Sequence, residues 1–235
     1  MNPIDCSADA APDSACRENR TATGSPLEQI KTLARRLFEN ARGSHDWDHT
    51  LRVCRLCKHI GAAEGADMQV LMIAAYLHDI GRCRQDASEG AVCHADKGAR
   101  MAWPLINRLA LSETQKANII HCIQAHRFRG SRRPETTEAR VLFDADKLDS
   151  IGAIGVARAY LFAGEIGAKL HNPDMAPEDA RSYSKNDTGF REFKVKLCKI
   201  KDRILTTEGR RLAEERHEFM EQFFNRFLEE YEGIR

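Results

Sequence analysis

The chain has 235 residues, 42% of them hydrophobic and 30% charged, with a formal net charge of +1, which is the composition of an ordinary globular protein long enough to bury a core. A net charge this close to zero argues against a nucleic-acid or membrane-surface binder, because neither anionic surface would attract the chain as a whole. No apolar run approaches the length of a membrane span and the N-terminus lacks the order of a secretory signal, so we expect a cytoplasmic protein.

The first 24 residues are rich in Ala, Ser, Asp and Pro without periodicity, and we expect them to form a disordered leader. Helical periodicity begins at Ser25, which can cap a helix with Pro26 at its first position and Glu28 in a capping box. Apolar residues then recur at helical spacing through most of the chain. The predicted helices cover approximately 25–37, 51–60, 67–80, 95–109, 112–123, 141–155, 190–205 and 207–231.

One predicted helix is unusual, because the run that starts at Val141 continues through Gly152 and Gly155. Small residues at these positions allow close helix contact or a kink. Residues 171–188 are polar and contain prolines, so we expect a connection there. The alternation typical of strands is almost absent, which predicts an all-α fold. We expect one domain over residues 25–235, with the C-terminal helices, about 188–232, packed on it.

Histidines and aspartates gather at the ends of the predicted helices. The segment HDWDH, residues 45–49, precedes one helix, and LHDIG, residues 77–81, ends another. Neighbours inside a helix diverge by about 100°, but near a helix end both members of an adjacent His-Asp pair can lean towards one ion. The segment DADKLD, residues 144–149, lies in an apolar run, where a carboxylate such as Asp146 needs a partner or a metal. These segments therefore predict a metal site.

Two imidazoles and two carboxylates suit a divalent ion such as Mn, Mg, Co, Ni, Fe or Zn and leave positions open for water and phosphate oxygens. The predicted ligands, in chain order, are His49, His78, Asp79 and Asp146. Their order matches the H…HD…D signature, and the flanks SHDWDHTLRV, AAYLHDIGR and DADKLDSIGAIGVAR extend the likeness. From about Ser25 to its C-terminus, the chain resembles the HD-domain metal-dependent phosphohydrolases, in particular their small bacterial members.

The resemblance implies an HD-domain helical bundle with a divalent metal in a central cleft, held by the four ligands. It also implies hydrolysis of a small phosphorylated substrate, and we expect a nucleotide. The preferred activity is that of a nucleoside triphosphate pyrophosphohydrolase, which releases nucleoside monophosphate and pyrophosphate. A phosphomonoesterase or a cyclic-nucleotide phosphodiesterase is an alternative, and a non-catalytic nucleotide-sensing protein is one of another class. No membrane or nucleic-acid partner is expected, and a homodimer is left open.

Within this framework, Asp79 is the candidate to orient or deprotonate the attacking water, and Lys97 to steady charge on the transferred group. His94 and His126 resemble the histidines that add a second metal in dinuclear branches of the family. Those branches usually have a further adjacent histidine pair, and here His126 is followed by Arg127. We therefore favour one metal with His94 and His126 facing the phosphates, and a dinuclear site stays the alternative.

Two more residues are expected at the site. Arg52 follows His49 by three residues, should point into the same cleft and is grouped with His94 and His126 as a candidate for the substrate phosphates or a second metal. Asp149 follows Asp146 by three residues on the same helix face and is the candidate to orient a ligand histidine. Asp144 is two residues off that face, so we expect it outside the cleft.

Overall fold

The computed structural model describes residues 25–38, 46–88, 91–127 and 132–235. These residues form helices and no strands, which confirms the predicted all-α fold. The expected leader, residues 1–24, lies outside them. The helices are α1 (Pro26–Leu37), α2 (Trp47–Glu64), α3 (Met68–Leu77), α4 (Arg82–Ala87), α5 (His94–Ile106), α6 (Glu113–Ala125), α7 (Thr137–Leu148), α8 (Gly152–Glu165), α9 (Gly189–Val195) and α10 (Thr207–Tyr231), with short 3-10 turns η2 (Leu197–Lys199) and η3 (Lys201–Arg203).

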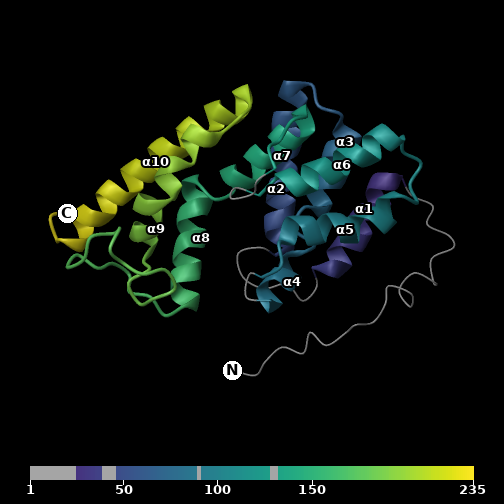
Figure 1. Cartoon of the computed structure of the whole chain (residues 1–235). Helices are drawn as coiled ribbons and strands as arrows, with labels where there is room; N and C mark the ends of the chain where they lie inside the picture. The colour runs from purple at the N-terminus through teal and green to yellow at the C-terminus, as the bar shows by residue number, and fades with distance from the viewer. Residues whose placement is uncertain (1–24, 39–45, 89–90, 128–131) are drawn as a thin grey trace.

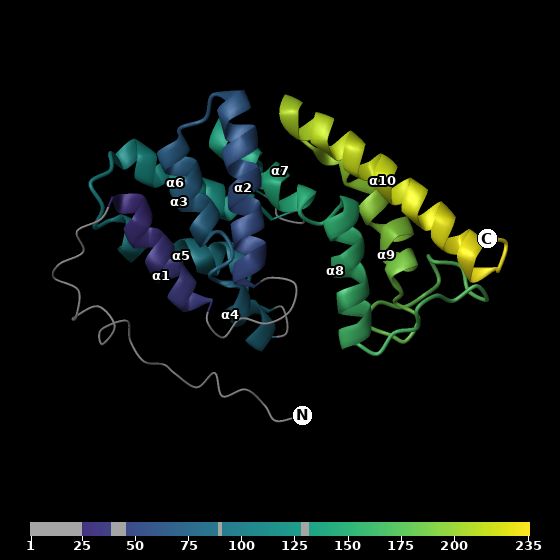
Figure 2. The ribbon, with the colours of Figure 1, turned by 180° about the vertical axis from the view of Figure 1, so that it is seen from behind.

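The helices form two groups that lie side by side (Figures 1 and 2). Helices α1 to α7 make the larger group, in which α2 packs against α3 and α7, and α6 packs against α3, α5 and α7. Helices α8, α9 and α10 make the smaller group, and α10 joins the two groups because it packs against α8, α7 and α2. One hydrophobic core runs through both groups, from Leu142 in α7 to Phe224 in α10. Within the described part of the chain, no helix has both the length and the apolar character that crossing a membrane requires.

Helix α2 begins at a side-chain cap that also positions a histidine. The carboxylate of Asp46 accepts a hydrogen bond from the backbone N–H of His49 at 2.9 Å. His49 therefore lies in the first turn of the helix, and Val53, Cys57 and Ile60 follow it on the same buried face. Because His49 shares the core-facing side of an amphipathic helix, its imidazole is carried into the protein interior.

The turn after α3 brings a second part of the site against α5. Helix α3 ends at Leu77, so His78 and Asp79 stand in this turn. A Cβ atom at Gly81 would lie 2.2 Å from the backbone oxygen of His94 and 2.6 Å from the backbone nitrogen of Gly98. Since any side chain there would collide with the backbone, glycine is what allows α5 to approach the turn so closely.

The long helix predicted over residues 141–155 is wrong. Helix α7 ends at Leu148, and α8 begins at Gly152, whose φ of 76° lies in the left-handed region that glycine adopts without steric cost. Apolar periodicity continues across this break and therefore does not reveal it. The chain turns at this point, so α7 ends beside the site and α8 leads into the smaller group. The helix predicted over 190–205 is likewise shorter, since α9 gives way to η2 and η3.

Candidate metal centre

Four buried histidines converge on Asp79, each from a different helix of the larger group. His49 comes from the first turn of α2, His78 from the end of α3, His94 from the start of α5 and His126 from the end of α6. The histidines are at most 3% exposed and Asp79 is 1% exposed. Segments far apart in the sequence thus build one compact polar cluster inside an apolar bundle.

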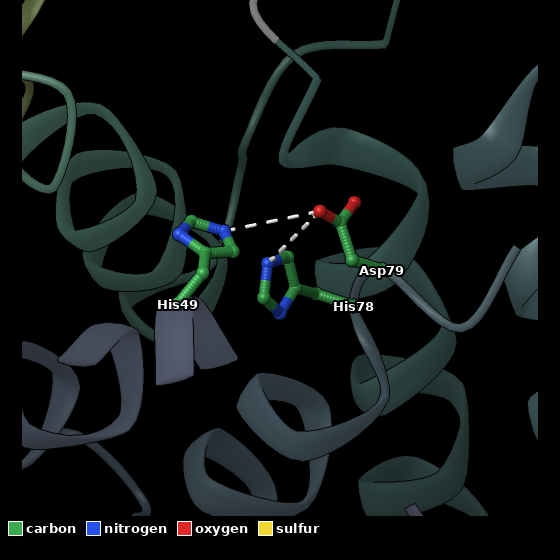
Figure 3. A group of neighbouring side chains, drawn as sticks. All are labelled: His49, His78 and Asp79. Carbon is green, nitrogen blue, oxygen red and sulfur yellow. Dashed lines mark ion pairs between the residues drawn. The ribbon is translucent and has the colours of Figure 1, made fainter. Parts of the chain in front are cut away.

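One oxygen of Asp79 faces the first histidine pair (Figure 3). Its Oδ2 lies 3.8 Å from Nε2 of His49 and 3.7 Å from Nε2 of His78. The ligand atoms of these three residues lie within 4.8 Å of one another, which suits one divalent ion with bonds of about 2.0–2.2 Å. Nε2 of His78 is buried and has no hydrogen-bond partner among the described residues. Both the spacing and this nitrogen fit a metal ligand set.

The other oxygen of Asp79 faces the second histidine pair. Its Oδ1 lies 3.5 Å from Nε2 of His94 and 3.4 Å from Nε2 of His126, and the two Nε2 atoms are 3.2 Å apart. These residues form a second group with the geometry to hold a metal ion. Asp79 belongs to both groups, so its carboxylate is placed to bridge two ions, an arrangement that dinuclear hydrolases use.

The opposite ring nitrogen, Nδ1, fixes the direction of all four imidazoles. Each Nδ1 faces an oxygen that only accepts hydrogen bonds, so in the neutral imidazole the hydrogen lies on Nδ1 and the lone pair on Nε2. Four lone pairs therefore point towards the Asp79 carboxylate, as metal ligation requires. The acceptors are Asp149 for His49 at 2.7 Å, Ala75 for His78 at 2.8 Å, Gln85 for His94 at 2.7 Å and Ile123 for His126 at 2.6 Å.

Burial keeps two of these imidazoles neutral. It lowers the pKa of His78 to about 4 and the pKa of His94 to about 2. The neutral ring is the form that binds a metal. Burial also acts to lower the pKa of His49, but the hydrogen bonds to Asp146 and Asp149 outweigh it and the pKa is raised. His49 is therefore the ligand at which a metal ion competes most directly with a proton.

Asp146, the fourth predicted ligand, approaches the cluster through His49. Its Oδ1 lies 3.4 Å from Nε2 of His49, while its Oδ2 accepts a hydrogen bond from Nζ of Lys147 at 2.6 Å. Lys147 is 7% exposed, and its Nζ also donates to the backbone oxygen of His126 at 2.9 Å. Burial acts to raise the pKa of Asp146, but Lys147 and His49 hold it well below the usual value. Sequence reasoning missed Lys147, although it stands in the DADKLD segment.

Asp149 joins His49 to two arginines at the end of α7. It is 1% exposed, and besides His49 it accepts hydrogen bonds from Nε of Arg52 at 2.7 Å and Nη1 of Arg158 at 2.8 Å. Burial acts to raise the pKa of Asp149, but the hydrogen bonds from His49 and Arg52 lower it overall. The side chains of Arg52 and Arg158 are 27% and 15% exposed, so positive charge lies between the cluster and solvent. Arg158 was not predicted from the sequence.

Three further charged residues differ in how they lie relative to the cluster. Lys97 stands three residues after His94 in α5, and its half-buried side chain forms no ion pair with the described residues. Asp144 lies outside the cluster and is fully buried, because it accepts hydrogen bonds from the backbone nitrogen and the hydroxyl of Thr206 at 2.7 Å and 2.6 Å. Arg82, which sequence reasoning did not single out, lies 3.3 Å from Oδ1 of Asp79.

Residues 46–151, which include every histidine of the cluster, match the family model of the HD domain. Over 214 residues the chain is 32% identical to YpgQ of Bacillus subtilis, covering 88% of this chain and 94% of that protein. The chain belongs to the HD-domain family. HD domains bind divalent metals, and the two groups around Asp79 have the geometry that could hold a metal ion in this HD-domain hydrolase.

Solved structures of HD-domain proteins share the fold over most of the chain. The crystal structure of Bacillus subtilis YpgQ in complex with ADP has a TM-score of 0.67 and 30% identity, covering 87% of this chain and 94% of that one. An HD-superfamily hydrolase from Bacillus thuringiensis has a TM-score of 0.69 and 28% identity, covering 88% and 96%. The similarity thus includes the helices beyond residue 151 as well as the domain that carries the cluster.

A shorter likeness connects this HD-domain hydrolase with ribonuclease Y of Chloroflexus aurantiacus. The two are 34% identical over 119 residues, which make up 51% of this chain and 21% of that protein. About half of the chain therefore corresponds to about a fifth of ribonuclease Y, whereas the chain covers nearly the whole of YpgQ.

Proposed function

We propose that this HD-domain hydrolase is a nucleoside triphosphate pyrophosphohydrolase, which converts a nucleoside triphosphate to the monophosphate and pyrophosphate. The observation that carries the proposal is the convergence of four Nε2 atoms on Asp79 with cationic side chains on two sides. Arg52 and Arg158 lie beyond His49 on one side, and Lys147 lies beside His126 on another. Positive charge on both sides suits a chain of several phosphates more than a single one. The complex of YpgQ with ADP supports a nucleotide.

A divalent ion bound here would lower the pKa of a water and neutralise charge on a phosphate oxygen. The residues of the chain supply the other functions. Asp79, buried between both histidine pairs, is the carboxylate placed to orient the attacking water while it serves as a ligand. Asp149 takes two of the five guanidinium N–H groups of Arg52, so other donors of the same side chain can bind the leaving pyrophosphate.

The test is product identification. The purified protein is incubated with nucleoside triphosphates in the presence of Mn, Mg, Co or Ni ions, in water labelled with heavy oxygen. We expect pyrophosphate as the first phosphate product and the label in the nucleoside monophosphate, because water attacks the α-phosphorus.

Release of orthophosphate with a nucleoside diphosphate would contradict the proposal. Faster turnover of phosphomonoesters or cyclic nucleotides would favour those alternatives. The Asp79→Asn variant and metal-stripped protein are the controls for contaminating phosphatases.

A further inference from the structure

Helix α8, which follows α7 after a short turn, carries exposed apolar side chains. Ile154 is 42% exposed and Leu161 is 55% exposed. Val156 and Ala159 on the other side of the helix are buried in the core, and α8 packs against α9 and α10. In both views α8 is on the side of the smaller group that is turned towards α1 to α7 (Figures 1 and 2). Large apolar side chains left exposed on one helix face mark a binding surface.

Arg158 shows which way this face is turned. Its Nη1 donates to the carboxylate of Asp149 at 2.8 Å and to the backbone oxygen of the same residue at 3.0 Å. The side chain of Arg158 therefore extends from this side of α8 to the end of α7, where Asp149 also holds His49. Ile154 precedes Arg158 by four residues and Leu161 follows it by three, and such spacings place side chains on one side of a helix. The apolar face thus adjoins the arginine that contacts the cluster.

We infer that Ile154 and Leu161 form the surface on which the nucleobase and ribose of the substrate lie, while its phosphates pass Arg158 to the histidine cluster. This inference rests on the proposed function and adds the position of the nucleoside.

Two features point to a nucleotide as the molecule that binds this surface: its charge pattern matches that of the surface, and the surface lies next to the arginine that contacts the metal centre. A nucleotide has a flat, weakly polar base at one end and anionic phosphates at the other. The α8 surface has two apolar side chains next to an arginine, and an apolar surface with few, well-placed polar groups is typical of small-molecule sites. Aliphatic side chains contact the face of any base without reading its hydrogen-bonding edge. We therefore expect similar affinity for purine and pyrimidine nucleotides.

The experiment compares the binding of ADP with that of inorganic pyrophosphate, which has the phosphates without the nucleoside, to the Mn-loaded protein. The variants are Ile154→Asp and Leu161→Asp, with Leu161→Met as the conservative change. Ile234→Asp is the matched control, because Ile234 is 72% exposed near the C-terminus. We expect each aspartate variant on α8 to raise the Kd of ADP about tenfold, with the Kd of pyrophosphate unchanged. Leu161→Met and Ile234→Asp should bind ADP like the wild type.

Equal Kd values for ADP in the wild type and both aspartate variants would overturn the inference, as would a wild type that binds ADP no more tightly than pyrophosphate. A wild-type dimer that Leu161→Asp dissociates, seen by light scattering, would show that the face is a subunit contact and would overturn it too. Binding is measured apart from turnover. If the protein releases products other than pyrophosphate and the monophosphate, the proposed function fails while the comparison of binding still decides the position of the nucleoside.

Discussion

The carboxylate of Asp149 lies 2.7 Å from Nδ1 of His49, and this contact joins residues one hundred positions apart in the sequence. It keeps the hydrogen of the imidazole on Nδ1 and leaves the lone pair of Nε2 towards Asp79. The same carboxylate holds Arg52 and Arg158. Asp149 thereby links the ligand geometry of the metal centre to the charge that would meet the phosphates.

The first prediction concerns this link. Asp149→Asn keeps the size of the side chain but replaces the carboxylate by a neutral amide, whose NH2 group can donate to Nδ1 of His49 and favour the other tautomer. We expect metal affinity to fall about 10- to 100-fold, the usual effect of removing a carboxylate behind a ligand histidine. Titration of the metal-stripped protein with Mn or Zn ions measures it.

Asp144→Asn is the control for that variant. Asp144 is equally buried in α7 but contacts Thr206 instead of a histidine. It should keep metal affinity and lose about 1–3 kcal/mol of unfolding free energy, because buried hydrogen bonds to a charged group are lost. Unchanged metal affinity in Asp149→Asn would show that Asp149 serves only the packing of α7.

The second prediction is the number of ions. The two ligand groups that share Asp79 predict about two divalent ions per chain. His94→Ala should reduce the content to about one, because His78 and His49 stay in place, while Asp79→Ala should lose both. Elemental analysis of protein dialysed against each metal gives the count. A wild type that binds a single ion with unchanged affinity in His94→Ala would instead support the mononuclear site favoured by the sequence.

The third prediction separates two lysines. Lys147→Met removes the positive charge between Asp146 and His126 but keeps a long apolar side chain for the buried position. We expect kcat to fall about 100-fold, as when one preorganised donor is lost from an active site. Lys97→Ala tests the catalytic role predicted from the sequence. If only Lys97→Ala lowers kcat, Lys147 has a packing role and Lys97 is the group that acts on the substrate.

The fourth prediction is a pH dependence of stability far from the centre. His171 is 9% exposed, and its ring lies edge-on to Tyr231 and Phe190 at 4.9 Å and 5.1 Å between ring centres. Burial lowers its pKa from 6.5, so the folded protein favours the neutral ring more than the unfolded chain does. This contribution is complete above pH 6.5 and is lost as the pH falls below it, at no more than about 1.4 kcal/mol per pH unit.

Urea unfolding at neutral and mildly acidic pH measures this loss. The His171→Phe variant keeps the aromatic packing without the titrating group, so its unfolding free energy should fall less on acidification than that of the wild type. Parallel losses in the two proteins would assign the acid sensitivity to other histidines.

Local signals account for what the sequence predicted well. The cap at Ser25, whose hydroxyl accepts a hydrogen bond from the backbone N–H of Glu28, is a short-range contact that residue type and spacing reveal. Apolar periodicity located most helices for the same reason. The apolar periodicity continued past Gly152 and did not reveal the break between α7 and α8. That break depends on the left-handed φ of a single residue, whereas the periodicity is a pattern over whole helical turns.

The environment of the site was less predictable because it depends on tertiary contacts. The sequence named His94 and His126 as candidates to face the phosphates or to hold a second metal. That both Nε2 atoms face the same oxygen of Asp79 depends on how α5 and α6 pack in the folded chain. Arg158 and Lys147 were not singled out. The contact of Arg158 with Asp149 depends on the turn between α7 and α8, and the contact of Lys147 with the backbone of His126 depends on the packing of α7 against α6.

The contact of Gly81 with the first turn of α5 sets the spacing between the two histidine pairs by main-chain atoms alone. A substitution at one ligand alters that ligand, whereas a larger residue at Gly81 would push the whole of α5, and His94 with it, away from Asp79. We therefore expect this protein to tolerate substitution least at Gly81, a residue that has no side chain and takes no part in the reaction.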